Sequence, residues 1–194
     1  MESVKSPKII WLVLIILFLL IAALIFFRSG IFSPAASLES EKIKISASLY
    51  PLAEFAKEIG QDKVEVSALV PPGVEPHEFD LTPQNRIRIE RSSIFIYNGA
   101  GFEFWAERIV SDLKSAAALD ASSGLSLMKE DPHFLNDPLL AEKVIDAILN
   151  KLVEVDQQNR LFYETNAANY KSKISELDQK FKNGLSASQS RDIV

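Results

Sequence analysis

The stretch IKISASLYPLAEFAKEIGQDKVEVSALV, residues 43–70, decides the fold. Its two ends, residues 43–49 and 64–70, show the short alternating apolar pattern of β-strands. Between them the sequence predicts an amphipathic helix over residues 52–59, which Gly60 closes. A strand, a helix and a second strand in this order predict a βαβ unit, and therefore a parallel sheet.

The same pattern continues toward the carboxyl terminus. It predicts a helix over residues 83–91, a strand over 94–97, a helix over 102–113 and a strand over 116–119. In the later of these helices, Phe104, Trp105, Ile109 and Leu113 are expected to face the core. The fold class is therefore α/β, a parallel-sheet lobe with flanking helices, and such sheets bind ligands at the carboxyl ends of their strands.

Two long helices are predicted after this lobe. Asp137 and Pro138 form a capped helix start, and an apolar stripe follows as far as Leu152. A second helix is expected over residues 157–182, ended by a glycine cap at Gly184. With about 26 residues it would be about 39 Å long, which suits an interdomain helix between two lobes.

The amino-terminal segment is strongly apolar. Residues 9–27 are 19 consecutive uncharged residues, enough for a transmembrane helix across about 30 Å of hydrocarbon. Lys5 and Lys8 precede this run and Arg28 follows it, which weakly favours export of the rest of the chain. An uncleaved signal-anchor and a cleaved signal peptide both stay open. Either one predicts a location at the outer face of the cytoplasmic membrane, periplasmic or extracellular, anchored or secreted.

Shifts in composition divide the chain into five segments. They are the signal-anchor or signal peptide (1–28), a flexible tether (29–42), an amino-terminal α/β lobe (43–136), a helical segment with the long linker helix (137–185), and the start of a truncated second lobe (186–194). A family resemblance, given below, implies that this chain is the first part of a two-lobe protein and that its second α/β lobe is missing.

Composition excludes several kinds of function. The 194 residues include no cysteine, which rules out disulfides, thiolate metal sites, a cysteine nucleophile and a bacterial lipobox. The net charge of −5 gives no reason to expect a nucleic-acid partner.

The two histidines are the candidate metal ligands. His77 follows Glu75-Pro76 and His133 follows Asp131-Pro132, so each lies on a loop that proline stiffens. Imidazole is the commonest protein ligand of transition metals, and both loops come after predicted strands. Four carboxylates lie near the histidines in the sequence: Glu75, Glu78, Asp80 and Asp131. Each of them either binds the metal or orients a histidine ligand, or is a solvated loop charge. We favour the solvated loop charge for all four.

Four ordered motifs carry a family resemblance. They are ASLYPL (47–52), VPPGVEPHEFD (70–80), YNGAGFE (97–103) and DPH (131–133). In this order they resemble the zinc- and manganese-binding substrate-binding proteins of ABC importers, the cluster A-I or zinc-uptake periplasmic family. The resemblance covers residues 43–194 and corresponds to the amino-terminal half of such a protein.

The resemblance implies two α/β lobes joined by a rigid helix, with the metal in the cleft between them. It implies that His77 and His133 are the ligands from the first lobe, and that two further ligands lie beyond Val194. Family members usually carry a Trp two residues after the second Pro-His, where this chain has Leu135. We expect this difference to change packing near the loop without removing the ligand.

The function implied is extracytoplasmic capture of a divalent metal ion, Zn or Mn, and its delivery to an ABC permease. The metal would be transported cargo rather than a catalytic cofactor, and the chain a monomer without enzymatic activity. A zinc-dependent hydrolase is one alternative, but it needs a third ligand and a general base, and no His-Glu-x-x-His motif is present. A metal-independent surface adhesion module on the same fold is the other.

Overall fold

The computed structural model describes residues 7–28, 41–114, 116–127 and 131–186. The chain forms two compact units, Met1–Ser40 and Glu41–Val194. In the first unit, helix α1 (Pro7–Arg28) covers the predicted apolar segment. Among the residues with described side chains, no helix has both the length and the apolar character that a bilayer crossing requires. The expected transmembrane span stays a prediction.

Two sequence predictions lie outside the described residues. These are the flexible tether, apart from its last two residues, and the start of a second lobe after residue 186.

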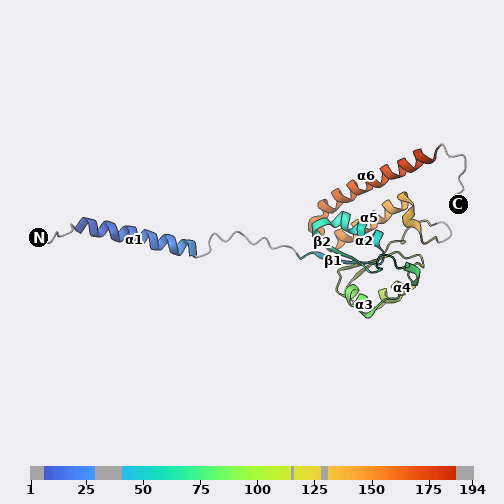
Figure 1. The fold of residues 1–194 in the computed structure, drawn as a ribbon, viewed down its shortest axis with the longest axis horizontal. Coiled ribbons are helices and arrows are strands. Elements are labelled where there is room, and N and C mark those ends of the chain that lie inside the picture. The colour runs from blue at the N-terminus through green and yellow to red at the C-terminus, as the bar shows by residue number, and fades with distance from the viewer. Residues whose placement is uncertain (1–6, 29–40, 115, 128–130, 187–194) are drawn as a thin grey trace. The chain divides into compact units, whose positions relative to one another are not determined.

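A four-stranded parallel sheet forms the centre of the second unit, in the order β2-β1-β3-β4 (Figure 1). Its strands are β1 (Ile43–Ala47), β2 (Val64–Ala68), β3 (Ile94–Tyr97) and β4 (Ala117–Asp120). In the register, Ile45 of β1 lies opposite Val66 of β2 and Ile94 of β3. The predicted α/β class with a parallel sheet is confirmed, and β2 and β4 are its outer strands.

Helices cover both faces of this sheet (Figure 1). On one face lie α2 (Tyr50–Gly60), α5 (Pro138–Val155) and α6 (Arg160–Leu185). On the other face lie α3 (Pro83–Glu90) and α4 (Phe104–Val110). Short 3-10 turns stand at Gln61–Lys63, Pro76–Glu78, Phe134–Asn136 and Gln157–Asn159.

Strand β3 divides the core in two because its side chains alternate between faces. Ile94 and Ile96 join the larger core under α2 and α5, while Phe95 and Tyr97 join the smaller core under α3 and α4. All four residues are buried. A short strand without polar residues is therefore what a sheet covered on both faces requires.

The helix starts predicted at Pro83 and at Asp137-Pro138 are confirmed. The Thr82 hydroxyl accepts a hydrogen bond from the Asn85 backbone N–H at 3.2 Å, and the Asp137 carboxylate accepts one from the Leu139 N–H at 2.8 Å. Each satisfies a backbone donor that the first helical turn leaves open.

The end of α2 differs from the prediction in its mechanism. Gly60 is the last helical residue, but the positive φ, 44°, belongs to Gln61. Gly60 is required for a different reason, since a Cβ there would lie 2.2 Å from Cγ1 of Val64. The glycine therefore allows β2 to begin directly against the helix end.

Three other local predictions are wrong. Helix α4 is shorter than expected, and the Phe104 side chain is 74% exposed, although Trp105 and Ile109 are buried as predicted. Helix α6 continues through Gly184 to Leu185, so that glycine is not a cap. Within α6 the side chains of Tyr163 and Ala167 are buried, whereas that of Leu161 is 76% exposed.

Candidate metal site

The two histidine loops start from the two outer strands. His77 lies in the turn Pro76–Glu78 after β2, and His133 immediately precedes the turn Phe134–Asn136 after β4. Because all the strands are parallel, both loops leave the sheet at its carboxyl edge. The topology therefore brings the ends of two separated loops to one place.

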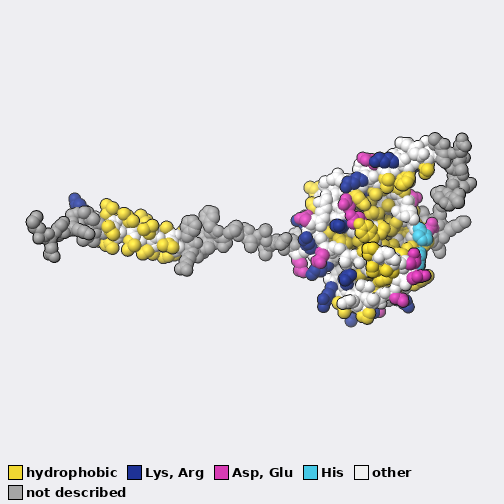
Figure 2. All heavy atoms as spheres, viewed as in Figure 1, with side chains coloured by type: hydrophobic (Ala, Val, Ile, Leu, Met, Phe, Trp, Pro, Cys, Tyr) yellow, Lys and Arg dark blue, Asp and Glu magenta, His cyan; other side chains and the backbone are white. Residues whose placement is uncertain are grey.

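The imidazole rings are close together at this edge. Their centroids are 5.7 Å apart with an interplanar angle of 71°. The buried Phe102 ring lies beside both, 4.2 Å from the His77 centroid and 5.6 Å from the His133 centroid. Both histidines are exposed, and Figure 2 shows them together on the surface beside acidic side chains.

Asp131 fixes the orientation of the His133 ring. Its Oδ1 accepts a hydrogen bond from the His133 backbone N–H at 2.9 Å and also lies 2.9 Å from Nδ1 of the ring. These two hydrogen bonds, the backbone one first, hold the pKa of Asp131 below its ordinary value. An ionised carboxylate can only accept, so Nδ1 carries the proton and the Nε2 lone pair stays free for a metal.

Solvation alone, the favoured interpretation for the nearby carboxylates, is therefore wrong for Asp131. Among the described residues, Glu75, Glu78 and Asp80 form no hydrogen bond to either histidine. The sequence placed Asp131 beside His133, but the direction of its side chain depends on the turn that Pro132 opens.

A buried carboxylate supports the His133 loop from below. The Glu103 side chain is 2% exposed and accepts hydrogen bonds from the backbone N–H groups of Asn98 (3.0 Å) and Gly99 (3.2 Å) and from the Ser48 hydroxyl. The Asn98 side chain in turn donates from Nδ2 to the Pro132 carbonyl at 2.9 Å. A continuous hydrogen-bonded path thus runs from the end of β1 to the residue before His133.

Burial raises the pKa of Glu103, and the hydrogen bonds from Ser48, Asn98 and Gly99 oppose that rise. Sequence reasoning missed Glu103 because an acidic residue before a helix is usually a solvated cap. The available signal was its position directly after the glycine-rich turn.

The turn itself depends on Gly99. Its φ is +76°, and a Cβ there would lie 1.9 Å from Oδ1 of Asp120. That Asp120 oxygen already accepts hydrogen bonds from the backbone N–H and the hydroxyl of Ser122. Only glycine lets the turn lie this close to the end of β4.

Leu135, at the position where the resemblance implies Trp, is half-buried and packs against the larger core beside the buried Phe134. No group of three or more metal-binding side chains is present within the described parts of the chain. The site as described thus consists of two imidazoles with an orienting carboxylate.

The sequence from residue 45 to residue 194 matches the family described as "Zinc-uptake complex component A periplasmic", or ZnuA. The chain belongs to the ZnuA family. Membership confirms the resemblance that the four motifs predicted.

Curated relatives of the ZnuA family carry both metal names. The chain is 28% identical to the high-affinity zinc uptake system protein ZnuA of Bacillus subtilis over 181 residues, 82% of this chain and 57% of that protein. It is 33% identical to the manganese ABC transporter substrate-binding lipoprotein PsaA of Streptococcus pneumoniae over 162 residues, 74% of this chain and 51% of that protein. The chain spans about half the length of these relatives.

Two solved structures share the fold of this chain. The Zn(II)-bound ZnuA-like domain of Streptococcus pneumoniae AdcA superposes with a TM-score of 0.73 at 28% identity, over 76% of this chain and 57% of that one. The metal-dependent lipoprotein YcdH of Bacillus subtilis gives 0.71 at 33% identity, over 73% and 55%.

Proposed function

We propose that this protein captures a divalent metal ion, Zn²⁺ or Mn²⁺, outside the cytoplasmic membrane and delivers it to an ABC-type permease. His77 and His133 are the ligands, and the metal is cargo rather than a catalytic cofactor. The observation that carries the proposal is that the only two histidines of the sequence meet at the carboxyl edge of the sheet. Their ring centroids are 5.7 Å apart.

This separation suits two imidazoles on one ion. With Zn–N bonds of about 2.0–2.1 Å and a tetrahedral angle, two ring centroids lie roughly 5 Å apart. The observed centroid distance of 5.7 Å is close to this value. The orienting role of Asp131 supports the same interpretation, because metal-binding histidines commonly donate their second ring N–H to a carboxylate.

Two imidazoles leave at least two positions of a tetrahedral ion for other donors. Nitrogen-rich sites favour zinc, and oxygen donors admit manganese, so those remaining donors set the preference. The names of the relatives include both metals, and the proposal keeps both.

Histidine NMR tests the proposal directly. The chain has only two imidazoles, so each ring proton signal is assigned by one single substitution. We expect Zn²⁺ to shift both sets of signals together and Mn²⁺ to broaden them, whereas Mg²⁺, which prefers oxygen ligands, leaves both unchanged.

Calorimetric titration of the full chain with Zn²⁺ provides the affinity. The double variant His77→Ala/His133→Ala should lose the binding, whereas Glu107→Gln, an exposed carboxylate on α4, should retain it. Equal zinc affinity in the double variant and the wild type would refute the assignment of these ligands.

The location follows from the same proposal, with residues 9–27 as the export segment, anchored or cleaved. Protease added to intact spheroplasts should degrade the globular part. Protection until the membrane is permeabilised would contradict an extracytoplasmic site.

A further inference from the structure

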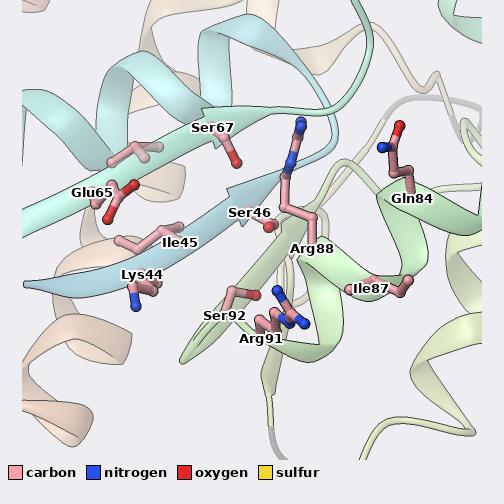
Figure 3. A pocket seen from close by; sticks show the side chains of 11 residues that line it. Lys44, Ile45, Ser46, Glu65, Ser67, Gln84, Ile87, Arg88, Arg91 and Ser92 are labelled. Carbon is pink, nitrogen blue, oxygen red and sulfur yellow. The ribbon is translucent and has the colours of Figure 1, made fainter.

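A polar groove lies away from the histidines, between the sheet and α3. It has a volume of about 600 Å³ and is lined by Lys44 to Ser46 of β1, by Glu65 to Ser67 of β2, and by α3 and Ser92. The groove lies on the face of the sheet that α3 and α4 cover, above strands β1 and β2. Figure 3 shows the Ser46 and Ser67 hydroxyls and the Arg88 side chain facing this space.

The groove contains a buried polar atom without a partner. The Ser46 side chain is 1% exposed, and its hydroxyl forms no hydrogen bond with any described residue. Buried hydroxyls in native proteins nearly always have a partner, so this one needs an explanation. Ser67 lies directly opposite Ser46 in the strand register, which places two hydroxyls side by side at the floor of the groove.

Two arginines, Arg88 near the end of α3 and Arg91 directly after it, face the same groove. Arg88 and Arg91 are exposed, and within the described residues neither forms an ion pair. Arg86 of the same helix differs, because it pairs with Glu90 at 3.1 Å and with Asp112 at 3.5 Å. A guanidinium group presents a planar set of donors that matches the oxygens of a carboxylate or a phosphate.

One acidic side chain completes the groove. Glu65 lies opposite Lys44 in the strand register, and the Lys44 ammonium is already 3.3 Å from Glu41. Among the described residues, Glu65 has no ion-pair partner, so its carboxylate is available to accept hydrogen bonds. The groove therefore presents cationic donors from α3 and an acceptor from β2.

We propose that this groove binds a small solute that carries an oxyanion, a carboxylate or a phosphate. Arg88 and Arg91 hold the oxyanion, and the Ser46 hydroxyl donates to one of its oxygens. Glu65 accepts from a hydroxyl or ammonium group on the same solute. The site is separate from the metal ligands, and its occupant is not the metal.

Calorimetric titration of the full chain with inorganic phosphate, citrate and L-serine tests the proposal. We expect at least one probe to bind with a dissociation constant of millimolar or below, and Arg88→Gln/Arg91→Gln to weaken it tenfold or more. Binding of phosphate alone identifies a phosphate group as the ligand. Binding of citrate or serine identifies a carboxylate, and Glu65→Gln should then weaken that binding severalfold.

A matched control is Arg108→Gln, which removes another exposed arginine, on α4 and outside the groove. It should leave probe binding unchanged, and zinc binding should be the same in all of these variants. Failure of every probe to bind, or equal weakening by Arg108→Gln and the double variant, would overturn the proposal.

Ser46→Ala gives an independent measurement. Removal of an unpartnered buried hydroxyl should raise the melting temperature of the ligand-free chain by about 2–4 °C and weaken probe binding severalfold. A lower melting temperature would show that the hydroxyl already has a structural partner, and would count against the proposal.

Discussion

The orientation of one imidazole depends on the residue two positions before it. Asp131 holds both the backbone N–H and the ring Nδ1 of His133, so the Nε2 lone pair points away from the Asp131 carboxylate. Among the described residues, His77 has no such carboxylate, and its ring lies instead against Phe102. The two proposed ligands are therefore positioned by different means, one by hydrogen bonds and one by packing.

Asp131→Asn should weaken zinc binding by about tenfold, because loss of an orienting carboxylate typically reduces metal affinity 10–100-fold. The asparagine keeps the size of the side chain but can present its NH₂ group to the ring. Competition with a chromophoric chelator measures the change. Asp80→Asn, an exposed carboxylate without a hydrogen bond to either histidine, is the control, and an equal loss in both variants would argue against orientation by Asp131.

Two glycines of the turn after β3 allow the cost of backbone strain to be distinguished from the cost of a steric clash. Gly99 and Gly101 both have a positive φ, +76° and +72°, but only at Gly99 would a Cβ collide with Asp120. Gly101→Ala should therefore cost about 1–2 kcal/mol from backbone strain alone. Gly99→Ala should cost clearly more and should also weaken zinc binding, because Asn98 then loses its place under Pro132. Urea unfolding of both variants measures this, and equal costs would exclude the contact with Asp120.

At the scale of the elements, the corner between α5 and α6 is closed by one carboxylate. Asp156, which follows α5, accepts hydrogen bonds from the Asn159 side chain at 2.6 Å and from the Tyr163 hydroxyl at 2.7 Å. Burial of Asp156 opposes its ionisation, but these hydrogen bonds outweigh it, and the pKa lies below its ordinary value. Burial and the neighbouring Asp156 raise the pKa of Tyr163.

Tyr163→Phe should lower the free energy of unfolding by about 1.5–3 kcal/mol, the range for a hydrogen bond to a charged group. Tyr170→Phe is the matched control on the same helix, because the Tyr170 hydroxyl forms no hydrogen bond with a described residue; its cost should stay within about 0.5 kcal/mol. Chemical unfolding at pH 7 measures both.

The cost should also depend on pH. The folded-state pKa of Asp156 is lower than the unfolded value of about 3.9, so its contribution is present above that value and is lost as pH falls through the folded pKa. The difference between wild type and Tyr163→Phe should thus shrink near pH 3. A constant difference from pH 7 to pH 3 would show that Asp156 is not the partner.

The sequence predicted elements wherever a local chemical signal marks them. Strand β3 is uniformly apolar, and α3 and α5 begin at capping residues followed by proline, so these elements were found close to their true bounds. Phe104 was misplaced because apolar periodicity cannot tell which helical face lacks a neighbour. The histidines were found from their motifs, whereas Glu103 was missed because its partners come from the ends of two other strands.

For the whole molecule, metal binding and folding should be linked. An ion that binds only the folded chain raises the free energy of unfolding, by about 2.7 kcal/mol at one hundred times its dissociation constant. Urea unfolding with and without Zn²⁺ should show this rise in the wild type, and His77→Ala/His133→Ala should abolish it. Equal stabilisation of that double variant would place the zinc elsewhere on the chain.

The outer-strand origin of the two histidines has one more consequence. About 55 residues of sequence separate His77 from His133, and in the folded chain the sheet already holds the two histidines close together. An unfolded copy that holds an ion on one imidazole must close this loop before the second arrives, at a cost of roughly 3–4 kcal/mol in chain entropy. Such a copy would bind a few hundred-fold more weakly. At a limiting supply of the ion, cargo loading would therefore discriminate between intact and damaged molecules, and only correctly folded copies would carry metal.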